Sequence, residues 1–404
     1  MYSVAAVCGR RRLGGHRPLL HLMRERIRDA KRVVVKLGSN LFFNEAGVIA
    51  LGRIFSFIEE IGAARLAGRQ MIVVSSGAVA LGADALKMKS STASLRQKQA
   101  LAAVGQSRLM NLYEQGFAKY GLTPAQVLLT EDDFASRKRY LNLRHTLMTL
   151  LEMGVIPVIN ENDTVSTSEL EITDRSRSFG DNDKLSALVM SKLEATLLVL
   201  LSDVDGLFTE DPRENPDAQF IREVRAITAD VEALAGRKSG RGRGGMETKL
   251  QAARIAINSG GMAIIANGLK PHILTRVLSG EEEGTLFVGK AGSLGEKRRW
   301  IAFASSVSGR IHINEGALDA ITKKNASLLY AGITRIENQF ANGDVVSIIG
   351  PNGEEVARGI VNYSSDDASK LIGKHSDDIA RLATSKNYDA FITRNNIAFL
   401  TEYR

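Results

Sequence analysis

The 404-residue chain has little of several residue types, and each shortage excludes a class of protein. It contains one cysteine, Cys8, which excludes an intramolecular disulfide and a cysteine zinc site and favours a reducing compartment. Its six histidines form no spaced metal motif. No apolar run approaches the roughly eighteen residues that a membrane span needs. The sequence therefore predicts a globular, cytoplasmic protein of two or three domains without a membrane partner.

Basic charge is concentrated at the N-terminus instead of being spread over the chain. The whole chain has 53 Lys and Arg against 45 Asp and Glu, a net charge of +8, and residues 1–32 alone hold nine basic and two acidic side chains. The rest is close to neutral, so a global nucleic-acid-binding face is not indicated. We interpret residues 1–30 as a basic extension. An over-long gene start before Met23 or a tail without function is favoured over an organelle signal, because serine is scarce there.

From Arg32 onward, short apolar runs alternate with longer helical patterns, as in βαβ units around a parallel sheet that is buried on both faces. The expected strands are Val33–Leu37, Met71–Ser75, Val155–Ile159, Leu197–Leu201 and Ala263–Ala266. The expected helices are Val48–Ala67, Arg96–Tyr120, Tyr140–Glu152, Asp181–Leu193 and Met246–Asn258. These patterns predict an α/β domain over residues 31–298.

The pattern changes after the polar, glycine-containing stretch Gly289–Arg299. The segments that follow are short and look like strands: Arg310–Ile313, Val345–Ile349 and Gly359–Tyr363. Turn residues stand between them at Asn342-Gly343-Asp344 and Pro351-Asn352-Gly353. We expect a small β-rich domain over residues 305–385 and a C-terminal tail over residues 386–404.

Two strand ends carry features that suit an anionic ligand. In open α/β sheets, ligands bind beyond the carboxyl ends of the strands. Lys36 stands at the end of the first expected strand and Gly38 directly follows that strand, and a lysine there is poorly solvated unless it meets an anion. After the second expected strand, the small residues Ser75–Ala78 open a helix whose N-terminal N–H groups favour negative charge.

Two clusters of Asn and Asp stand at further element ends. Asn160–Asp163 follows the strand Val155–Ile159, and Gly180–Lys184 opens a helix. One such cluster alone is more often a turn or a helix cap. Two of them together with Lys36 favour a binding site, and neither has the spacing of an EF-hand, so no metal-ligating residue is predicted.

Two further segments suit a nucleotide. Ser202–Leu207 directly follows the strand Leu197–Leu201, and Gly240–Lys249 is a glycine-rich loop that runs into a helix. The loop contains G-x-G-x-x-G but follows no strand, so a dinucleotide site is not favoured, and the order Thr248-Lys249 excludes a Walker A loop. A flexible loop is the plain alternative, although a lysine at a helix start after glycines suits polyphosphate binding.

Together these features predict phosphoryl transfer. Charge then spreads over the oxygens of the transferring group, so the protein positions reactants and supplies cations from more than one side. Lys36 and Lys249 can do this, and Asp183 can keep both lysines charged and oriented. No Ser-His-Asp or Cys-His set offers a nucleophile for hydrolysis.

In this order, the motifs resemble those of the glutamate 5-kinases, members of the amino acid kinase family that carry a C-terminal PUA domain. The resemblance covers residues 31–385. It is carried by Val34–Ser39, Val74–Ala78, Leu101–Ser107, Val158–Asp163, Gly180–Asp183, Ser202–Leu207 and Gly244–Lys249. It implies a three-layer α/β sandwich with a mainly parallel central sheet, followed by a small β-rich PUA domain. We also expect a homo-oligomer.

The resemblance implies ATP-dependent phosphorylation of the side-chain carboxylate of L-glutamate, with Mg²⁺, as the first step of L-proline synthesis under feedback inhibition by proline. The implied catalytic residues are Lys36, Lys249 and Asp183. The implied glutamate-binding residues are Ser76, Asp163, Asn182, Asn160 and Asp181. The implied ATP-binding residues are Lys36, Ser202, Asp203, Arg243, Gly244, Gly245, Met246, Glu247, Thr248 and Lys249.

The chain departs from the family pattern in its N-terminal extension and in the longer segment Glu169–Phe179, which bears on regulation by proline. One alternative is another enzyme of the amino acid kinase family, acting on a different carboxylate or phosphate. A second is RNA binding by the PUA domain. Residues 308–384 carry eight basic and ten acidic side chains, and a net charge of −2 disfavours a nucleic-acid partner.

Overall fold

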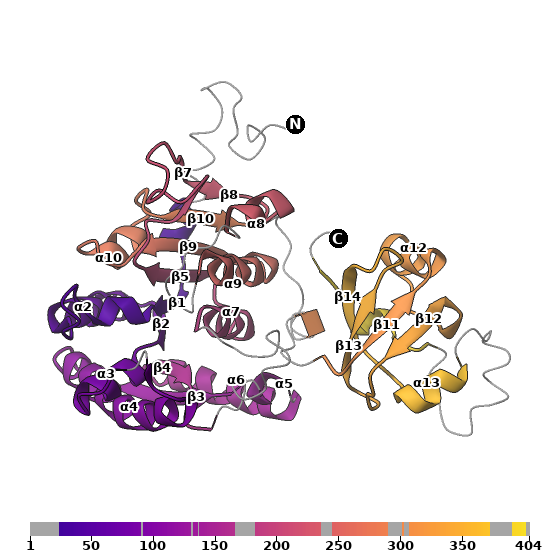
Figure 1. The fold of residues 1–404 in the computed structure, drawn as a ribbon, viewed down its shortest axis with the longest axis horizontal. Helices are drawn as coiled ribbons and strands as arrows, with labels where there is room; N and C mark the ends of the chain where they lie inside the picture. The colour runs from indigo at the N-terminus through magenta and orange to yellow at the C-terminus, as the bar shows by residue number, and fades with distance from the viewer. Residues whose placement is uncertain are drawn as a thin grey trace. The chain divides into compact units, whose positions relative to one another are not determined.

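The computed structural model describes residues 24–89, 92–130, 132–135, 137–165, 182–235, 245–289, 301–302, 307–371 and 390–400. The chain divides into two compact units, each built around its own sheet (Figure 1). The first unit comprises Met1–Asp133 and Lys138–Ser293, and the second comprises Phe134–Arg137 and Leu294–Arg404.

Among the described residues, eight strands form the central sheet of the first unit, in the order β3-β4-β2-β1-β5-β9-β10-β8. Their bounds are β1 Arg32–Leu37, β2 Gln70–Ser75, β3 Pro124–Leu129, β4 Ile156–Glu161, β5 Leu197–Ser202, β8 Glu223–Val224, β9 Met262–Asn267 and β10 Thr285–Val288. The strands from β3 to β9 in this order pair in parallel, and β10 is antiparallel to β9. A short ribbon joins β6 Leu207–Phe208 to β7 Phe220–Ile221.

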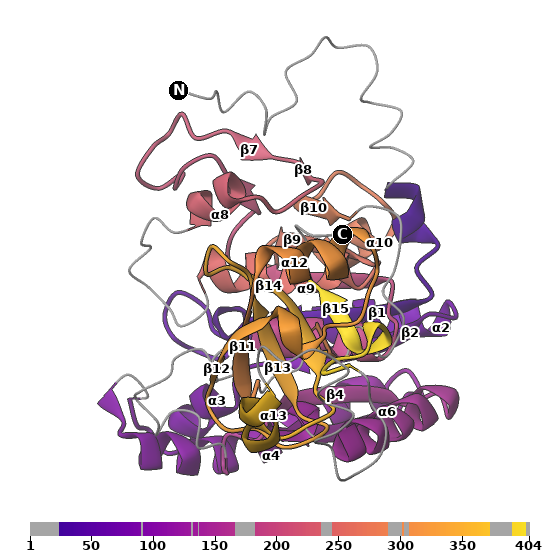
Figure 2. The same ribbon diagram turned by 90° about the vertical axis from the view of Figure 1, so that its right-hand side faces the viewer.

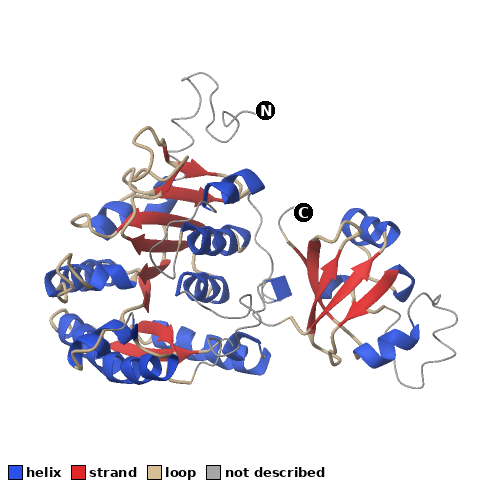
Figure 3. Cartoon of the chain, viewed as in Figure 1, coloured by secondary structure: helices blue, strands red, loops and turns tan. Residues whose placement is uncertain are grey.

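Helices cover both faces of this sheet, which confirms the predicted three-layer sandwich (Figures 1 and 3). The helices along residues 51–278 are α2 Leu51–Leu66, α3 Ala78–Ala85, α4 Leu95–Ala118, α5 Asp132–Ala135, α6 Arg137–Glu152, α7 Asn182–Lys192, α8 Ala229–Ala235, α9 Met246–Asn258 and α10 Ile273–Leu278. In Figure 1, α2, α3, α4 and α10 lie on one side of the strands, and α6, α7 and α9 lie on the other. Because both faces are covered, the central strands are continuous apolar runs, and every residue of β5 is buried.

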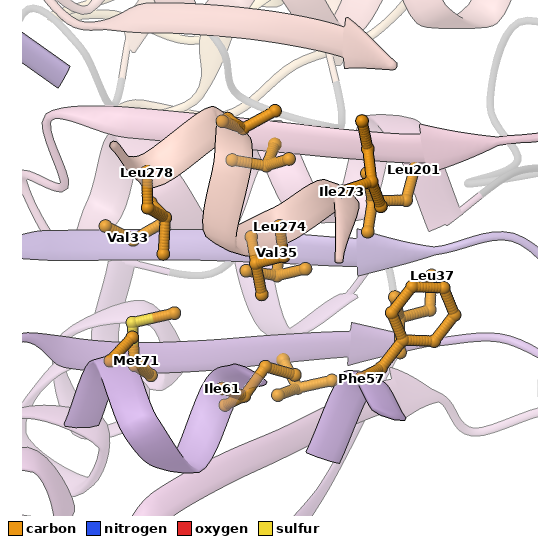
Figure 4. Packing of buried hydrophobic residues seen from close by; sticks show 14 of the residues in the cluster. Val33, Val35, Leu37, Phe57, Ile61, Met71, Leu201, Ile273, Leu274 and Leu278 are labelled. Carbon is orange, nitrogen blue, oxygen red and sulfur yellow. The ribbon is translucent and has the colours of Figure 1, made fainter. Parts of the chain in front are cut away.

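The alternation of side chains along β1 decides which of them can reach the site. Val33, Val35 and Leu37 pack into the core formed with α2 and α10 (Figure 4). Successive side chains of a strand point to opposite faces, so Lys36 points to the face covered by α7 and α9. The same rule applies to β5, where Leu201 belongs to the α2 and α10 face and Ser202 lies on the face of Lys36.

In the second unit, five strands among the described residues form a sheet in the order β12-β11-β13-β14-β15. Their bounds are β11 Gly309–Ile313, β12 Ile333–Glu337, β13 Val345–Ile349, β14 Glu355–Ile360 and β15 Ile397–Phe399, with helices α12 Glu315–Lys323 and α13 Ser365–Leu371. Figure 2 shows β11, β13 and β14 side by side, and their core contains Tyr330, Phe340 and Phe391. Both predicted turns are confirmed, because Gly343 and Gly353 have φ of +92° and +83°.

Some element bounds differ from the sequence-based expectation. The expected helix Val48–Ala67 begins only at Leu51, because Ala50 has φ −83° and ψ 64°, outside the helical region. The expected strand Gly359–Tyr363 was placed too far along the sequence, since the observed strand β14 runs from Glu355 to Ile360. Strands β3, β10 and β12 were not expected, because each is short or interrupted by polar residues.

Candidate active site

The candidate residues lie near the end of β1, where the next strands of the chain are added first on one side of β1 and later on the other. From β1 the chain continues to β2 on one side of β1, and β5 later pairs with β1 on its other side. In open α/β sheets, ligands bind in the crevice outside such a switch point, which here lies at the carboxyl ends of β1 and β5. The N–H of Gly38, just beyond β1, donates to the carbonyl of Leu201 at 3.1 Å and ties the two strand ends together.

A buried cluster of opposite charges lies beside this crevice. Asp183, in the first turn of α7, has a fully buried side chain. One of its oxygens lies 2.6 Å from Lys36 Nζ, and the other lies 3.1 Å from Lys249 Nζ. The hydroxyl of Thr248 also donates to Asp183 at 3.1 Å. Residues from β1, α7 and α9 thus form one ion cluster, which is the set that the sequence analysis predicted to be catalytic.

The two lysines of this cluster favour the ionised state of Asp183. Burial by itself raises the pKa of Asp183, but the ammonium groups of Lys36 and Lys249 outweigh it, and the pKa lies below its ordinary value. Each lysine side chain is only 5% exposed. Lys249 also interacts with the carboxylate of Asp203, beyond the end of β5, so the lysines connect the cluster to the residues predicted to bind ATP.

A chain of hydrogen-bonded amides joins three of the predicted glutamate-binding residues. Asn182 Nδ2 donates to Asn160 Oδ1 at 3.0 Å and to Ser76 Oγ at 2.8 Å. Ser76 is held at the end of β2 by the turn into α3, where Gly77 has φ +106°, a conformation that favours glycine. The structure therefore brings Ser76, Asn160 and Asn182 together directly beside Asp183.

Asp163 lies in the wall of a cavity of about 310 Å³. The cavity is also lined by Gln106, Gln126 and Asn162. Its walls come from α4, β3 and the residues that follow β4. Asp181, the fifth predicted glutamate-binding residue, lies outside the described residues.

The residues predicted to bind ATP lie at the ends of β5 and α9. Ser202 is the last residue of β5, and its hydroxyl donates to Asp203 at 3.0 Å. Asn40 donates to the other Asp203 oxygen at 2.9 Å, and these hydrogen bonds outweigh burial and lower the pKa of Asp203. Gly245 precedes α9, which starts with Met246, Glu247, Thr248 and Lys249. Arg243, Gly244 and most of the glycine-rich loop lie outside the described residues.

Sequence reasoning assigned no role to Gln106 or Tyr113, two buried polar residues of α4. Gln106 Oε1 accepts from Asn160 Nδ2 at 2.9 Å, and the Tyr113 hydroxyl donates to Ser75 Oγ at 2.8 Å. Burial raises the pKa of Tyr113. Gln106 belongs to the segment Leu101–Ser107 that carries the family resemblance, and this was the available signal.

Two family models match the chain: the amino acid kinase family over residues 31–267 and the PUA domain over residues 309–383. A glutamate 5-kinase of Geobacter sp. (strain M21) is 44% identical over 380 residues, which cover 94% of this chain and 100% of the relative. The chain belongs to the glutamate 5-kinases of the amino acid kinase family. A glutamate 5-kinase of Pseudomonas putida (strain W619) is 43% identical over 379 residues, again 94% of this chain and 100% of the relative.

Among solved structures, an isopentenyl phosphate kinase aligns with a TM-score of 0.43 and 16% identity, covering 64% of this chain and 100% of its own. Family membership makes the chain an enzyme with a kinase unit and a C-terminal PUA domain. In the described ranges of this chain, no helix has both the length and the apolar character that a membrane span requires.

Proposed function

We propose that the enzyme transfers the γ-phosphoryl group of ATP to the side-chain carboxylate of L-glutamate, giving γ-glutamyl phosphate and ADP. The observation that carries this proposal is the buried cluster of Lys36, Asp183 and Lys249 at the carboxyl end of β1. The names of relatives that match nearly the full chain support the choice of substrate.

The reaction needs no general base, because the glutamate side chain is already ionised near neutral pH. One carboxylate oxygen forms a bond to the γ-phosphorus, and the bond from this phosphorus to the bridging oxygen of ADP breaks. Negative charge then spreads over the transferring group and the leaving oxygen. We assign Lys36 and Lys249 to stabilise this charge from two sides.

Asp183 suits a positioning role and not proton transfer. Both of its oxygens are engaged by the lysines, and its pKa is lowered, so it stays ionised at neutral pH. Its charge keeps the two buried ammonium groups protonated and separate. A preorganised pair of cations then requires little rearrangement when charge develops in the transition state.

We assign glutamate binding to Ser76, Asp163 and Asn182, with Asn160 and Asp181 beside them. Ser76, Asn160 and Asn182 are linked by hydrogen bonds, and Asn182 directly precedes Asp183. A glutamate held by these residues therefore has its reactive carboxylate near the lysine pair. Asp163 adds a carboxylate that suits the substrate ammonium group.

We assign ATP binding to Ser202, Asp203 and the segment Arg243–Lys249. The start of α9 offers the N–H groups of a helix N-terminus, which favour phosphate oxygens. Across the described ranges, no three His, Cys, Asp or Glu side chains gather in a way that could hold a metal ion. Mg²⁺ bound with ATP would offset the negative charge of the phosphates.

We further propose that the enzyme works in the cytoplasm as a homo-oligomer, in the first step of L-proline synthesis, and that proline inhibits it. We expect no RNA partner. The basic side chains Arg335 and Arg358 on the sheet of the second unit are paired with Glu337 and Glu355, which reduces the positive charge that this sheet can offer to RNA.

The test is ADP release by the purified full-length chain with ATP and Mg²⁺. We expect release that depends on L-glutamate, does not occur with L-aspartate, N-acetylglutamate or uridine monophosphate, and falls when L-proline is added. ADP release with one of the other acceptors and not with glutamate would refute the proposed substrate.

A further inference from the structure

Gln106 stands at the end of a polar chain that begins at the proposed glutamate site. Asn182 Nδ2 donates to Asn160 Oδ1 at 3.0 Å, and Asn160 Nδ2 donates to Gln106 Oε1 at 2.9 Å. Asn160 is 2% exposed and Gln106 is 8% exposed, so water has little access to these amides. We call Gln106, Asn160 and Asn182 the amide relay.

The direction of the relay is fixed at the Asn182 end. Asn182 Nδ2 also donates to Ser76 Oγ at 2.8 Å and reaches the Ser75 carbonyl oxygen at 3.4 Å. A backbone carbonyl can only accept, so the NH₂ group of Asn182 must face it. Asn160 then has to present its oxygen to Asn182, which leaves its own buried NH₂ group in need of an acceptor. Gln106 Oε1 is that acceptor.

Close packing of two helices holds Gln106 in place. A Cβ added at Gly105 would lie 1.7 Å from the carbonyl oxygen of Ala78, and one added at Gly82 would lie 1.9 Å from that of Leu101. The backbones of α3 and α4 therefore touch, and Gln106 is carried next to the turn that contains Ser76. This contact fixes the backbone position from which the Gln106 side chain reaches Asn160.

The relay leaves the carbonyl oxygen of Asn182 for the substrate. Asn182 Oδ1 is buried and has no hydrogen-bond partner among the described residues. Glutamate at neutral pH has two carboxylates, which only accept, and one ammonium group, which only donates. Since only the ammonium group of glutamate can donate to this oxygen, we assign Asn182 Oδ1 to the α-ammonium group of the substrate, an assignment that rests on the proposed function.

We propose that Gln106 is a positioning residue that holds the oxygen of Asn160 toward Asn182. Together with Ser75 and Ser76, Asn160 then keeps the Asn182 carbonyl oxygen directed at the substrate ammonium group. Gln106→Met removes the acceptor at nearly constant side-chain size. The NH₂ group of Asn160 then lacks a buried partner, so the Asn160 amide loses its fixed orientation and Asn182 loses a fixed acceptor.

The experiment compares Gln106→Met, Gln106→Glu, Asn182→Ala and the double variant Gln106→Met/Asn182→Ala with the full-length enzyme. Ser107→Ala is the matched control, because Ser107 lines the same cavity but donates to the Val104 carbonyl and not to the relay. The measurements are kcat, the KM values for glutamate and ATP, thermal unfolding, and the inhibition constant of glutarate, which is glutamate without its ammonium group.

We expect Gln106→Met to raise the glutamate KM at least about tenfold and to change the ATP KM and the glutarate inhibition constant less than about twofold. Gln106→Glu keeps an oxygen for Asn160, and its glutamate KM is expected within about threefold of the unmodified enzyme. The double variant should be little worse than Asn182→Ala, since both changes remove one interaction.

Equal weakening of glutamate and glutarate, or independent effects of Gln106→Met and Asn182→Ala, would overturn the positioning role. If Gln106→Met does not fold, the Gln106→Glu variant decides. A rise in its glutamate KM as large as that of Asn182→Ala would also overturn the positioning role. Failure of the proposed function is a separate result, because the unmodified enzyme would then release no ADP with glutamate.

Discussion

Replacing Asp183 with asparagine removes the negative charge at the centre of the site and keeps the shape of the side chain. Lys36 Nζ and Lys249 Nζ lie 2.6 and 3.1 Å from the two carboxylate oxygens, and all three side chains are at most 5% exposed. In the variant, two buried ammonium groups face a neutral amide. Breaking a buried ion pair by removing one partner costs about 3–5 kcal/mol, and we expect this loss in the free energy of unfolding.

The pH dependence separates this charge effect from a packing effect. Without Asp183, the two buried ammonium groups repel each other, and loss of a proton relieves this repulsion in the folded variant but not in its unfolded state. The free energy of unfolding of the variant therefore rises with pH. The difference in this free energy between the unmodified protein and the variant should narrow between about pH 7 and pH 10. In the unmodified protein, the lowered pKa of Asp183 means that its stabilisation is present above the pKa of the unfolded chain and is lost as pH falls through the lowered value.

The assay is urea unfolding of both proteins at the two pH values, with kcat measured under the same conditions at neutral pH. We expect kcat to fall at least about 100-fold, because the lysines lose the charge that orients them. A loss of stability below about 1 kcal/mol with kcat intact would refute the reasoning, since surface ion pairs contribute no more than this.

Three further predictions concern individual parts of the site. Lys36→Ala and Lys249→Ala should each lower kcat at least about 100-fold with little change in the glutamate KM, and a change in KM alone would contradict a transition-state role. Asp163→Ala and Asn182→Ala should raise the glutamate KM about tenfold or more and leave the ATP KM within about twofold; equal effects would place these residues wrongly. Gly105→Ala should destabilise the fold by about 3 kcal/mol or more in urea unfolding, because its Cβ has no space at the α3–α4 contact, and unchanged stability would disprove that contact.

Much of the first unit can be predicted from the sequence because its central strands are buried on both faces. Continuous apolar runs such as Leu197–Leu201 are recognisable without any tertiary information. Strand β3 is harder to predict, since it begins with Pro124 and is only partly buried along its length. Helix α3 consists largely of small residues without a strong apolar period, and its place is set by the close contact with α4.

The candidate site also has residues that the sequence reveals and contacts that it does not. Lys36, Asp183 and Lys249 stand at element ends, where a charged residue needs an explanation, and so they can be selected from the sequence. Their ion pairs join residues far apart in the chain, and no local pattern gives those distances. Gln106 lies inside a helix, where a glutamine usually faces solvent. Only the packing of α4 against α3 and β4 makes it a buried partner of Asn160.

The most direct test of the central claim is chemical identification of the product. An acyl phosphate reacts with hydroxylamine to give a hydroxamate, so the enzyme is incubated with ATP, Mg²⁺, L-glutamate and hydroxylamine, and the hydroxamate is identified by mass spectrometry. We predict that glutamate γ-hydroxamate forms in step with ADP and that Lys249→Ala abolishes both. ADP release without a hydroxamate, or a hydroxamate at the α-carboxylate, would contradict transfer to the side-chain carboxylate.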